Sequence, residues 1–291
     1  MIMQLKGHTG TVYDIAINND GLIASVSSDK TIRFWDLKSG KQLKMLEGIH
    51  SKPVYGVEFH PFDDSLLATC SMDNKIALWD IEKRTRLRVL KGHGRSVRSI
   101  EFSLDGTVLI SGSHDKTIGV WDITSGKLLR TLSGHLDQVW SVAVGYDMIF
   151  ASASKDKTAR LWNLETGELL NVFSHSDYVS DVAFSPQIDL LASACFDNNI
   201  YLWQSNSKSP VRLIKEAHTQ PVLGIAFSHN GKFIASSSAD CSIGLWEVRT
   251  GECIMRLGDH LGPVRKVIFD KNDAFVISCS EDKTIGILEL I

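Results

Sequence analysis

The sequence is built from one unit of forty-odd residues that occurs seven times. In each copy an Asp stands six positions before a Trp, or before the residue that replaces it. The Trp positions are 41 to 44 residues apart and comprise Trp35, Trp79, Trp121, Trp162, Trp203, Trp246 and Leu288. The Asp positions are Asp29, Asp73, Asp115, Asp156, Asp197, Asp240 and Asp282. A fixed period of this length is typical of propellers and other repeat arrays.

Two further polar positions recur with the same period. A hydroxyl residue stands four positions before each Asp: Ser25, Thr69, Ser111, Ser152, Ser193, Ser236 and Ser278. A histidine precedes each Trp position by 27 to 29 residues: His8, His50, His93, His135, His175, His218 and His260. Residues that recur in every unit serve the architecture better than they serve a single active site, so we assign these four positions to a structural network.

The pattern within each unit is that of short strands. Runs of four to seven residues, rich in β-branched and aromatic residues, alternate with turn signals such as "NNDG", "LDGT" and "TSGK". Four antiparallel strands per copy, packed face to face around an axis, predict an all-β, seven-bladed β-propeller. The last copy stops after its third strand, whereas residues 2–6 resemble a fourth strand. We therefore expect one domain over residues 1–291, with strand 2–6 completing the blade formed by about 261–291 and closing the ring.

Composition excludes several classes of protein. The net charge is -3 and no basic run occurs, which argues against direct nucleic acid binding. No stretch has the roughly 18 apolar residues of a membrane helix. The five cysteines are scattered and never spaced as CxxC, so we expect no disulfide framework, no metal site and no cofactor. We expect a monomeric ring in the cytoplasm, the nucleus or both.

The units resemble those of the WD-repeat β-propeller family. Gly-His is intact at Gly7-His8, Gly92-His93 and Gly134-His135, and Trp-Asp at Trp35-Asp36, Trp79-Asp80 and Trp121-Asp122. The resemblance implies that each Trp indole is linked to the Ser or Thr hydroxyl, the hydroxyl to His, and His to Asp. It accounts for "SHDKTIGVWD", residues 113–122, whose Ser, His and Asp otherwise resemble a hydrolase triad. We expect no catalytic residue, and a looser last blade because Leu288 has no indole.

Positions that vary between the copies are the candidates for function. The residue five after each His lies on the innermost strand, and the resemblance implies that it borders the top rim, where many members bind peptides. We expect partner binding there through Tyr13, Tyr55, Arg98, Trp140 and Arg265, joined by Lys155, His114, Phe196 and Tyr178. Trp, Tyr and Arg are enriched in interface hot spots. Peptide segments that are acidic or phosphorylated and carry aromatic residues would suit this surface.

Weaker signals lie elsewhere in the chain. Glu58 and Glu101 occupy matching positions in neighbouring copies and could form a carboxylate pair, but solvation at a strand edge or a salt bridge is the simpler interpretation. Asp14 and Asp181 give no further signal, and "QSNSKSP" (204–210) is a polar turn without a motif.

The first hypothesis for function is a non-catalytic scaffold or adaptor subunit of an intracellular multiprotein complex. A sensing domain from a larger signalling protein is an alternative, and an enzyme that uses the channel mouth is a third.

Overall fold

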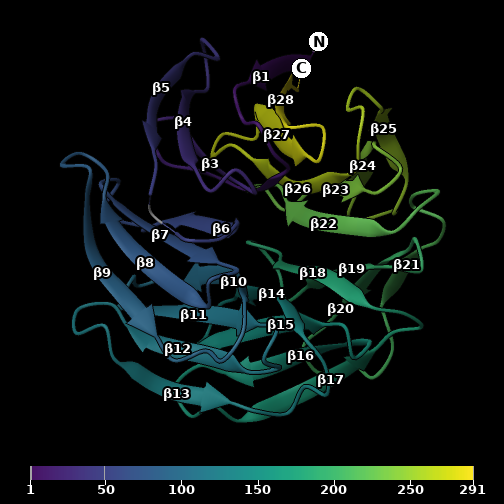
Figure 1. The fold of residues 1–291 in the computed structure, drawn as a ribbon. Coiled ribbons are helices and arrows are strands. Elements are labelled where there is room, and N and C mark those ends of the chain that lie inside the picture. The colour runs from purple at the N-terminus through teal and green to yellow at the C-terminus, as the bar shows by residue number, and fades with distance from the viewer. Residues whose placement is uncertain (1, 49, 291) are drawn as a thin grey trace.

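The computed structural model describes residues 2–48 and 50–290, which form seven four-stranded antiparallel sheets arranged in a ring (Figure 1). This architecture confirms the predicted seven-bladed β-propeller. Met1, Ile49 and Ile291 lie outside the described residues, and with them both ends of the expected 1–291 domain. Over the described ranges, no helix has the length and apolar character required to cross a membrane.

Each blade runs from an innermost strand to an outermost one, and the innermost strands of adjacent blades contact one another around the central channel. Blades 1 to 3 comprise β2 (Val12–Ile17), β3 (Leu22–Ser27), β4 (Ile32–Asp36), β5 (Gln42–Leu46); β6 (Val54–Phe59), β7 (Leu66–Ser71), β8 (Lys75–Asp80), β9 (Thr85–Lys91); and β10 (Val97–Phe102), β11 (Val108–Ser113), β12 (Ile118–Asp122), β13 (Leu128–Leu132). Blades 4 to 6 comprise β14 (Val139–Val144), β15 (Ile149–Ser154), β16 (Thr158–Asn163), β17 (Leu169–Ser174); β18 (Val179–Phe184), β19 (Leu191–Cys195), β20 (Ile200–Trp203), β21 (Arg212–Ile214); and β22 (Val222–Phe227), β23 (Phe233–Ser238), β24 (Ile243–Glu247), β25 (Cys253–Leu257). Blade 7 comprises β26 (Val264–Phe269), β27 (Phe275–Ser280), β28 (Thr284–Glu289) and β1 (Ile2–Lys6).

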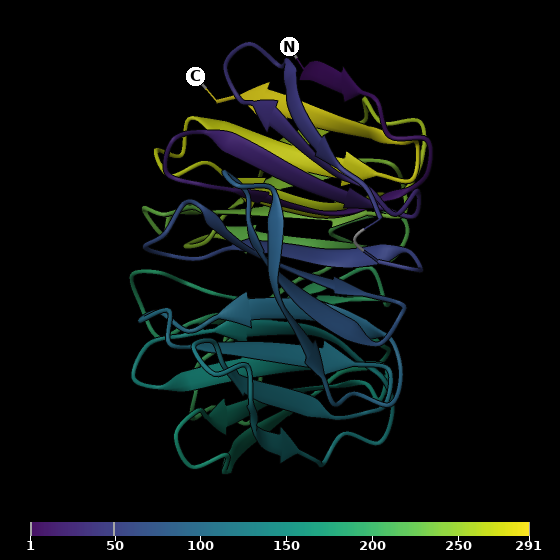
Figure 2. The same ribbon diagram turned by 60° about the vertical axis from the view of Figure 1, so that its left-hand side comes forward.

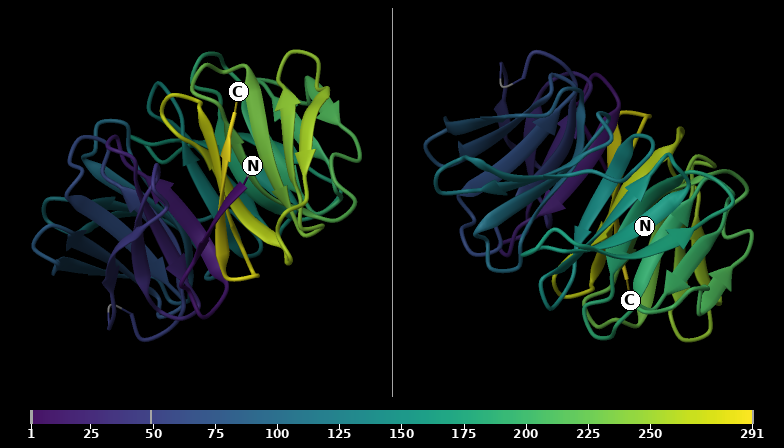
Figure 3. Two further views of the ribbon diagram at one scale, coloured as in Figure 1. Left: turned by 90° about the horizontal axis from the view of Figure 1, so that it is seen from above. Right: turned by 90° about the horizontal axis from the view of Figure 1, so that it is seen from below.

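The ring is closed by the N-terminal strand, as the sequence predicts. β1 pairs antiparallel with β28, in a register that sets Met3 opposite Ile287 and Lys6 opposite Thr284. Figures 1 and 3 show the purple β1 beside the yellow β28. Leu5 is buried and belongs to the same apolar cluster as Ile285 and Ile287. Closure therefore gives β28 a partner on its outer side and removes an open sheet edge from the ring.

The hydrophobic core is divided into clusters that lie between adjacent blades. One cluster, for example, joins Ala24 and Phe34 of blade 1 to Val57 and Trp79 of blade 2. Figure 2 shows the blades from the side, with successive sheets facing one another. A sheet that is covered on both faces needs apolar residues at successive positions, which explains why the second strand of each blade is buried almost throughout.

The tight turn between the second and third strand of each blade explains the recurring Asp. The residue after it adopts a left-handed conformation in all seven blades, with φ between 67° and 75°: Lys30, Asn74, Lys116, Lys157, Asn198, Cys241 and Lys283. In blade 1 the Asp29 carboxylate accepts a hydrogen bond from the Thr31 backbone N–H, at 2.9 Å. Asp stabilises such turns by bonding to the backbone two residues on. These turns lie on the same face as the loops that enter each innermost strand, and we call that face the top.

Candidate functional site

A buried chain of hydrogen bonds connects the recurring polar residues within the blades. In blade 3 the Trp121 indole N–H donates to Ser111 Oγ at 2.8 Å, Ser111 lies 2.8 Å from His93 Nε2, and His93 Nδ1 lies 2.9 Å from Asp115. The same three links occur in blades 1, 2, 4 and 6. Ser111 is fully buried between its two partners. The network therefore fastens the top loop and the turn of these five blades to their sheets.

The hydrogen bonds define the donors and acceptors in this network. Because the carboxylate can only accept, Nδ1 carries the proton that faces Asp, and Nε2 is then free to accept from the hydroxyl. Burial lowers the pKa of His135, although Asp156 acts in the opposite direction. Burial also disfavours the charged form of Asp156, but the hydrogen bonds from His135, Thr158 and the Leu136 backbone N–H together outweigh it and hold the pKa of Asp156 well below its usual range. Donors and acceptors are thus matched along the whole chain of groups.

Blades 5 and 7 depart from the pattern. No hydrogen bond joins His175 to Asp197; His175 Nδ1 lies 3.1 Å from the Phe173 carbonyl oxygen instead. The Asp197 carboxylate accepts hydrogen bonds from the hydroxyls of Tyr201 and Ser176. The link implied by the resemblance is therefore wrong for blade 5, because the Tyr201 side chain supplies the donor that His provides elsewhere.

In blade 7, Ser278 keeps its contact with His260 at 2.9 Å, and Leu288 stands where the other blades have an indole. Leu288 is nevertheless buried and packs in the apolar cluster between blades 6 and 7.

A β-bulge near the start of each innermost strand creates the top mouth of the channel. In blade 1, Val12 pairs with Ser27 and Asp14 with Val26, so Tyr13 is skipped in the ladder. The same register shift occurs in all seven blades, always at the position five after the His. A bulged residue leaves the ladder and its side chain is redirected. Seven side chains are thereby turned to one opening.

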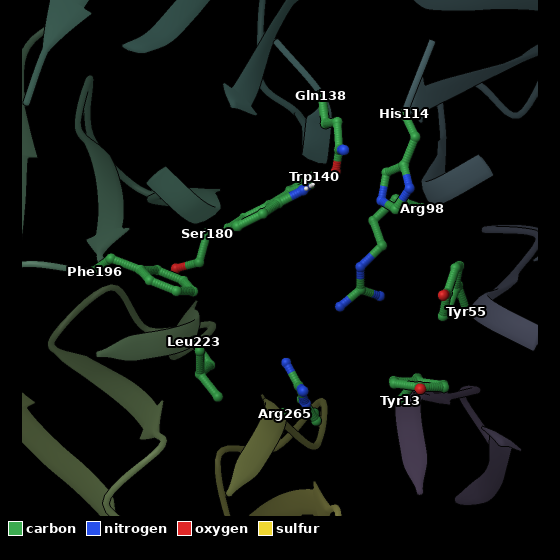
Figure 4. A pocket seen from close by; sticks show the side chains of 10 residues that line it. All are labelled: Tyr13, Tyr55, Arg98, His114, Gln138, Trp140, Ser180, Phe196, Leu223 and Arg265. Carbon is green, nitrogen blue, oxygen red and sulfur yellow. Dashed lines mark hydrogen bonds between the residues drawn. The ribbon is translucent and has the colours of Figure 1, made fainter. Parts of the chain in front are cut away.

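These side chains line a cavity of about 240 Å³ at the top mouth (Figure 4). Seven of the nine residues expected at the rim border it: Tyr13, Tyr55, Arg98, His114, Trp140, Phe196 and Arg265. Gln138, Ser180 and Leu223 complete the lining. Lys155 and Tyr178 lie beside it, where the Lys155 ammonium is 5.3 Å from the centre of the Tyr178 ring and that ring is 5.8 Å from Trp140.

One side of this cavity is basic. The Arg98 guanidinium lies 4.9 Å from the centre of the Tyr55 ring and 5.7 Å from that of Tyr13, and Arg265 approaches Tyr13 at 6.0 Å. Figure 4 shows the two guanidinium groups pointing toward the middle of the opening from different blades. Arg265 is paired with Glu281. Among the residues that the structure describes, no carboxylate lies within ion-pair distance of Arg98.

Burial and mutual repulsion shape the charges on this side. Burial, and then the nearby charge of Arg265, lower the pKa of Arg98. Burial, followed by the charge of Arg98, lowers the pKa of His114 to about 4, so His114 is neutral at physiological pH. An anion placed between the two arginines would relieve their repulsion. The arrangement therefore favours a negatively charged ligand group.

The opposite side of the cavity is apolar. Trp140 lies 5.3 Å from Phe196 between ring centres, and Tyr178 packs against both rings. The Trp140 indole N–H donates to Gln138 Oε1 at 3.1 Å, which fixes the orientation of the ring. Leu223 borders the same side (Figure 4). The mouth can therefore contact a charged group and an apolar group at the same time.

The channel below the mouth contains charged residues that are only partly exposed. Glu58 and Glu101 line a second cavity of about 270 Å³ together with Asp14 and Lys266. Burial raises the pKa of Glu101 to about 7 and that of Asp14 to about 6, and it raises the pKa of Glu58 well above its usual value. Both glutamates are half-buried on edge strands that face the channel rather than bulk solvent, so the expected solvation is only partial.

In blades 1 and 5 an Asp stands six positions after the His and ties the innermost strand to that of the next blade. Asp14 accepts a hydrogen bond from the Val57 backbone N–H of blade 2 at 3.1 Å, and Asp181 accepts one from Ile225 of blade 6 at 3.0 Å. The Lys266 ammonium lies 2.9 Å from Asp181 across the channel. Although burial acts against its charge, the carboxylates of Asp181 and Asp14 raise the pKa of Lys266. Asp14 and Asp181 both stand six positions after a recurring His, and this shared spacing was the signal in the sequence for their contacts with the next blade. Over the described ranges, no three His, Cys, Asp or Glu side chains are grouped to hold a metal ion.

Comparison with known proteins identifies the repeats. The family described as "WD domain, G-beta repeat" matches residues 1–36, 40–80, 84–122 and 126–163, and the family described as "Anaphase-promoting complex subunit 4 WD40 domain" matches residues 182–272. The Poly(A)+ RNA export protein of Schizosaccharomyces pombe is 35% identical over 78 residues, which are 26% of this chain and 22% of that protein.

Two other relatives match over similar lengths. The Lissencephaly-1 homolog 1 of Paramecium tetraurelia is 40% identical over 21% of this chain and 15% of its own. A probable cytosolic iron-sulfur protein assembly protein 1 of Candida glabrata is 34% identical over 25% of each chain. The matches thus span a quarter or less of these relatives, and they concern the repeat rather than a whole protein. With four repeats matched and seven blades in the ring, the chain belongs to the WD40 repeat family.

Proposed function

We propose that this chain is a non-catalytic scaffold or adaptor subunit of a multiprotein complex and that it binds a segment of a partner protein at the top mouth of its channel. The observation that carries the proposal is the Arg98 guanidinium, which faces the 240 Å³ cavity with aromatic rings around it and no carboxylate partner among the described residues. A half-buried cation of this kind is stabilised by a ligand that brings the missing anion.

The two sides of the cavity define the chemistry of the segment. An aspartate, glutamate or phosphorylated side chain would lie between Arg98 and Arg265, with the planar guanidinium of Arg98 free to form paired hydrogen bonds. An aromatic or apolar side chain of the same segment would pack against Trp140 and Phe196. Lys155, beside Tyr178, adds a positive charge on the approach to the apolar side.

We further propose that residues 1–291 act as one domain and that the ring is monomeric. The names of two relatives, a cytosolic iron-sulfur protein assembly protein and an RNA export protein, support a location in the cytoplasm or nucleus. We expect the contacts of this chain to be with proteins rather than with nucleic acid, because its net charge is -3.

The test compares partners captured by the parent protein with those captured by the Arg98→Ala and Trp140→Ala variants. Arg95→Ala is the matched control, because Arg95 is an exposed arginine near the top face that does not border the cavity. Affinity purification with mass spectrometry should show the same partners lost from both cavity variants and retained by the control. Melting curves establish that each variant is folded. If both folded cavity variants retain every partner, the top mouth is not the binding site.

A further inference from the structure

The outermost strand of blade 5 is unusually short. β21 has three residues, Arg212–Ile214, whereas the outermost strands of the other six blades have five to seven. In blade 2 the equivalent strand begins at Thr85 and covers the third strand as far as Asp80, but in blade 5 pairing stops at Leu202. The residues in place of the missing half strand, 204–210, form a polar loop.

This loop is held on the side of blade 5 that faces blade 4. The Asn171 side-chain amide, on β17, donates hydrogen bonds to the carbonyl oxygens of Ser205 and Ser207 at 2.9 and 3.0 Å. The Lys208 ammonium donates to Asn171 Oδ1 at 3.2 Å, and Ser205 Oγ donates to Asp189 at 2.8 Å. Because these contacts fix the loop toward blade 4, it leaves the side toward blade 6 uncovered.

The uncovered side is an apolar groove of about 650 Å³ between blades 5 and 6. Its apolar lining comprises Ile188, Leu190, Leu202, Val211, Phe233 and Val248. Val211 is 49% exposed and Ile188 55% exposed, so two of these side chains lie largely in water. Surface of this kind, gathered in one hollow, is typical of a docking site. The groove is formed by the turns at the ends of the blades opposite the top mouth, so it is separate from the site of the proposed function.

Positive charges surround the groove. The Arg212 guanidinium donates to the carbonyl oxygens of Thr250 and Arg249 at 2.7 and 2.6 Å, which clamps the neighbouring hairpin in place. Lys232 and Arg249 are exposed and have no ion-pair partner in the described part of the chain. Glu247 is the one acidic residue that lines the described groove, and its carboxylate accepts a hydrogen bond from the Thr250 hydroxyl. The rim is therefore basic around an apolar floor.

We propose that the groove between blades 5 and 6 is a second docking site, which binds a partner protein segment that carries apolar side chains with aspartate or glutamate beside them. The apolar side chains fill the space between Val211 and Phe233, and the carboxylates face Lys232 and Arg249. Charge complementarity selects this occupant, because a basic segment would be repelled by the same rim. A ring with a ligand at each face would hold two partners at once.

The experiment uses random peptides displayed on phage, selected on the parent protein and counter-selected on the Val211→Glu variant. Leu87→Glu is the matched control, since Leu87 has the same place in blade 2, eight residues after the Trp, and is similarly exposed at 55%. Melting curves verify that both variants are folded. We expect selected peptides to combine apolar residues with Asp or Glu, and to bind Val211→Glu and Lys232→Glu at least about tenfold more weakly than the parent or Leu87→Glu.

The Arg98→Ala variant separates this site from the top mouth. Peptides selected in this way should bind Arg98→Ala as tightly as the parent. A result that rejects the groove as a docking site then leaves the proposal for the top mouth open to test, and the reverse also holds. The proposal is overturned if no peptide survives counter-selection, if the survivors bind Val211→Glu and Leu87→Glu equally, or if their sequences carry basic residues or no acidic ones.

Discussion

Replacing Glu101 by Gln should make the stability of this protein less dependent on pH. Glu101 lies in the channel, and burial raises its pKa to about 7 from an ordinary value of 4.5. The folded protein therefore holds a proton on this carboxyl over a range of pH in which the unfolded chain has released it. Because the folded state binds the extra proton, stability is highest below about 4.5 and falls as the pH rises to 7.

The size of this effect on the free energy of unfolding follows from the shift in the pKa of Glu101. Each unit of pKa corresponds to about 1.4 kcal/mol, so a rise from 4.5 to about 7 gives a ceiling of about 3 kcal/mol. The Glu101 side chain is half-buried rather than fully buried, so solvent screening reduces the penalty, and we expect about 1–3 kcal/mol. Gln is neutral at every pH and has nearly the shape of protonated Glu. The variant should thus match the parent at pH 4.5 and exceed its stability by this amount at pH 8.

Thermal unfolding at pH 4.5, 6 and 8 measures the difference. At about 2–4 °C per kcal/mol, Glu101→Gln should melt roughly 2–12 °C above the parent at pH 8. Glu252→Gln is the control, because Glu252 is exposed on the turn before β25. A difference between Glu101→Gln and the parent that is the same at all three pH values, or a parent that is the more stable at pH 8, would refute the argument.

Two further predictions concern the blades. Deletion of residues 1–6 should lower the free energy of unfolding by about 3 kcal/mol or more, since it removes the buried Leu5 and uncovers the outer edge of β28. Differential scanning calorimetry should show a lower melting temperature, and light scattering should show association. An unchanged melting curve would contradict closure of the ring by β1. Tyr201→Phe should cost about 1–2 kcal/mol, because the hydroxyl is a donor to the Asp197 carboxylate, and urea titration measures it. The pKa of Asp197 lies below its ordinary value of 3.8, so the loss should shrink only as the pH falls below that value and protonation removes the charge that the hydroxyl stabilises. A loss independent of pH would argue for packing instead.

The fold could be predicted from sequence because every blade repeats the same local solution. The Asp of each turn, the buried hydroxyl and the His recur with fixed spacing. A departure in one copy, such as Leu288 in the Trp position, therefore does not hide the pattern that the other six copies share. The residues at the top mouth were found in the same way, since the position five after the His varies in a frame that does not. The bulge that turns Tyr13 and its counterparts toward the channel has no signature of its own in the sequence.

What could not be predicted depends on contacts between units. Glu58 and Glu101 look like ordinary polar positions of a strand, and only the curvature of the ring encloses them. Tyr201 is an exception, because its hydroxyl bonds to Asp197 only four residues earlier in the same blade, and the spacing of the repeat gives no sign that it replaces His175. The groove beside β21 arises from hydrogen bonds between Asn171 and a loop more than thirty residues later in the chain.

The pairing of Ile2 with Leu288 has a consequence for biosynthesis. At about 5–20 residues per second, a ribosome delivers the second of these residues roughly 15–60 s after the first. During that interval six blades can assemble while β1 has no partner strand. Its apolar residues then stay exposed and can pair with another chain. Docking of β1 onto β28 therefore has to wait until residue 288 is made, and β1 strands of neighbouring nascent molecules on one polysome could be exchanged in that interval.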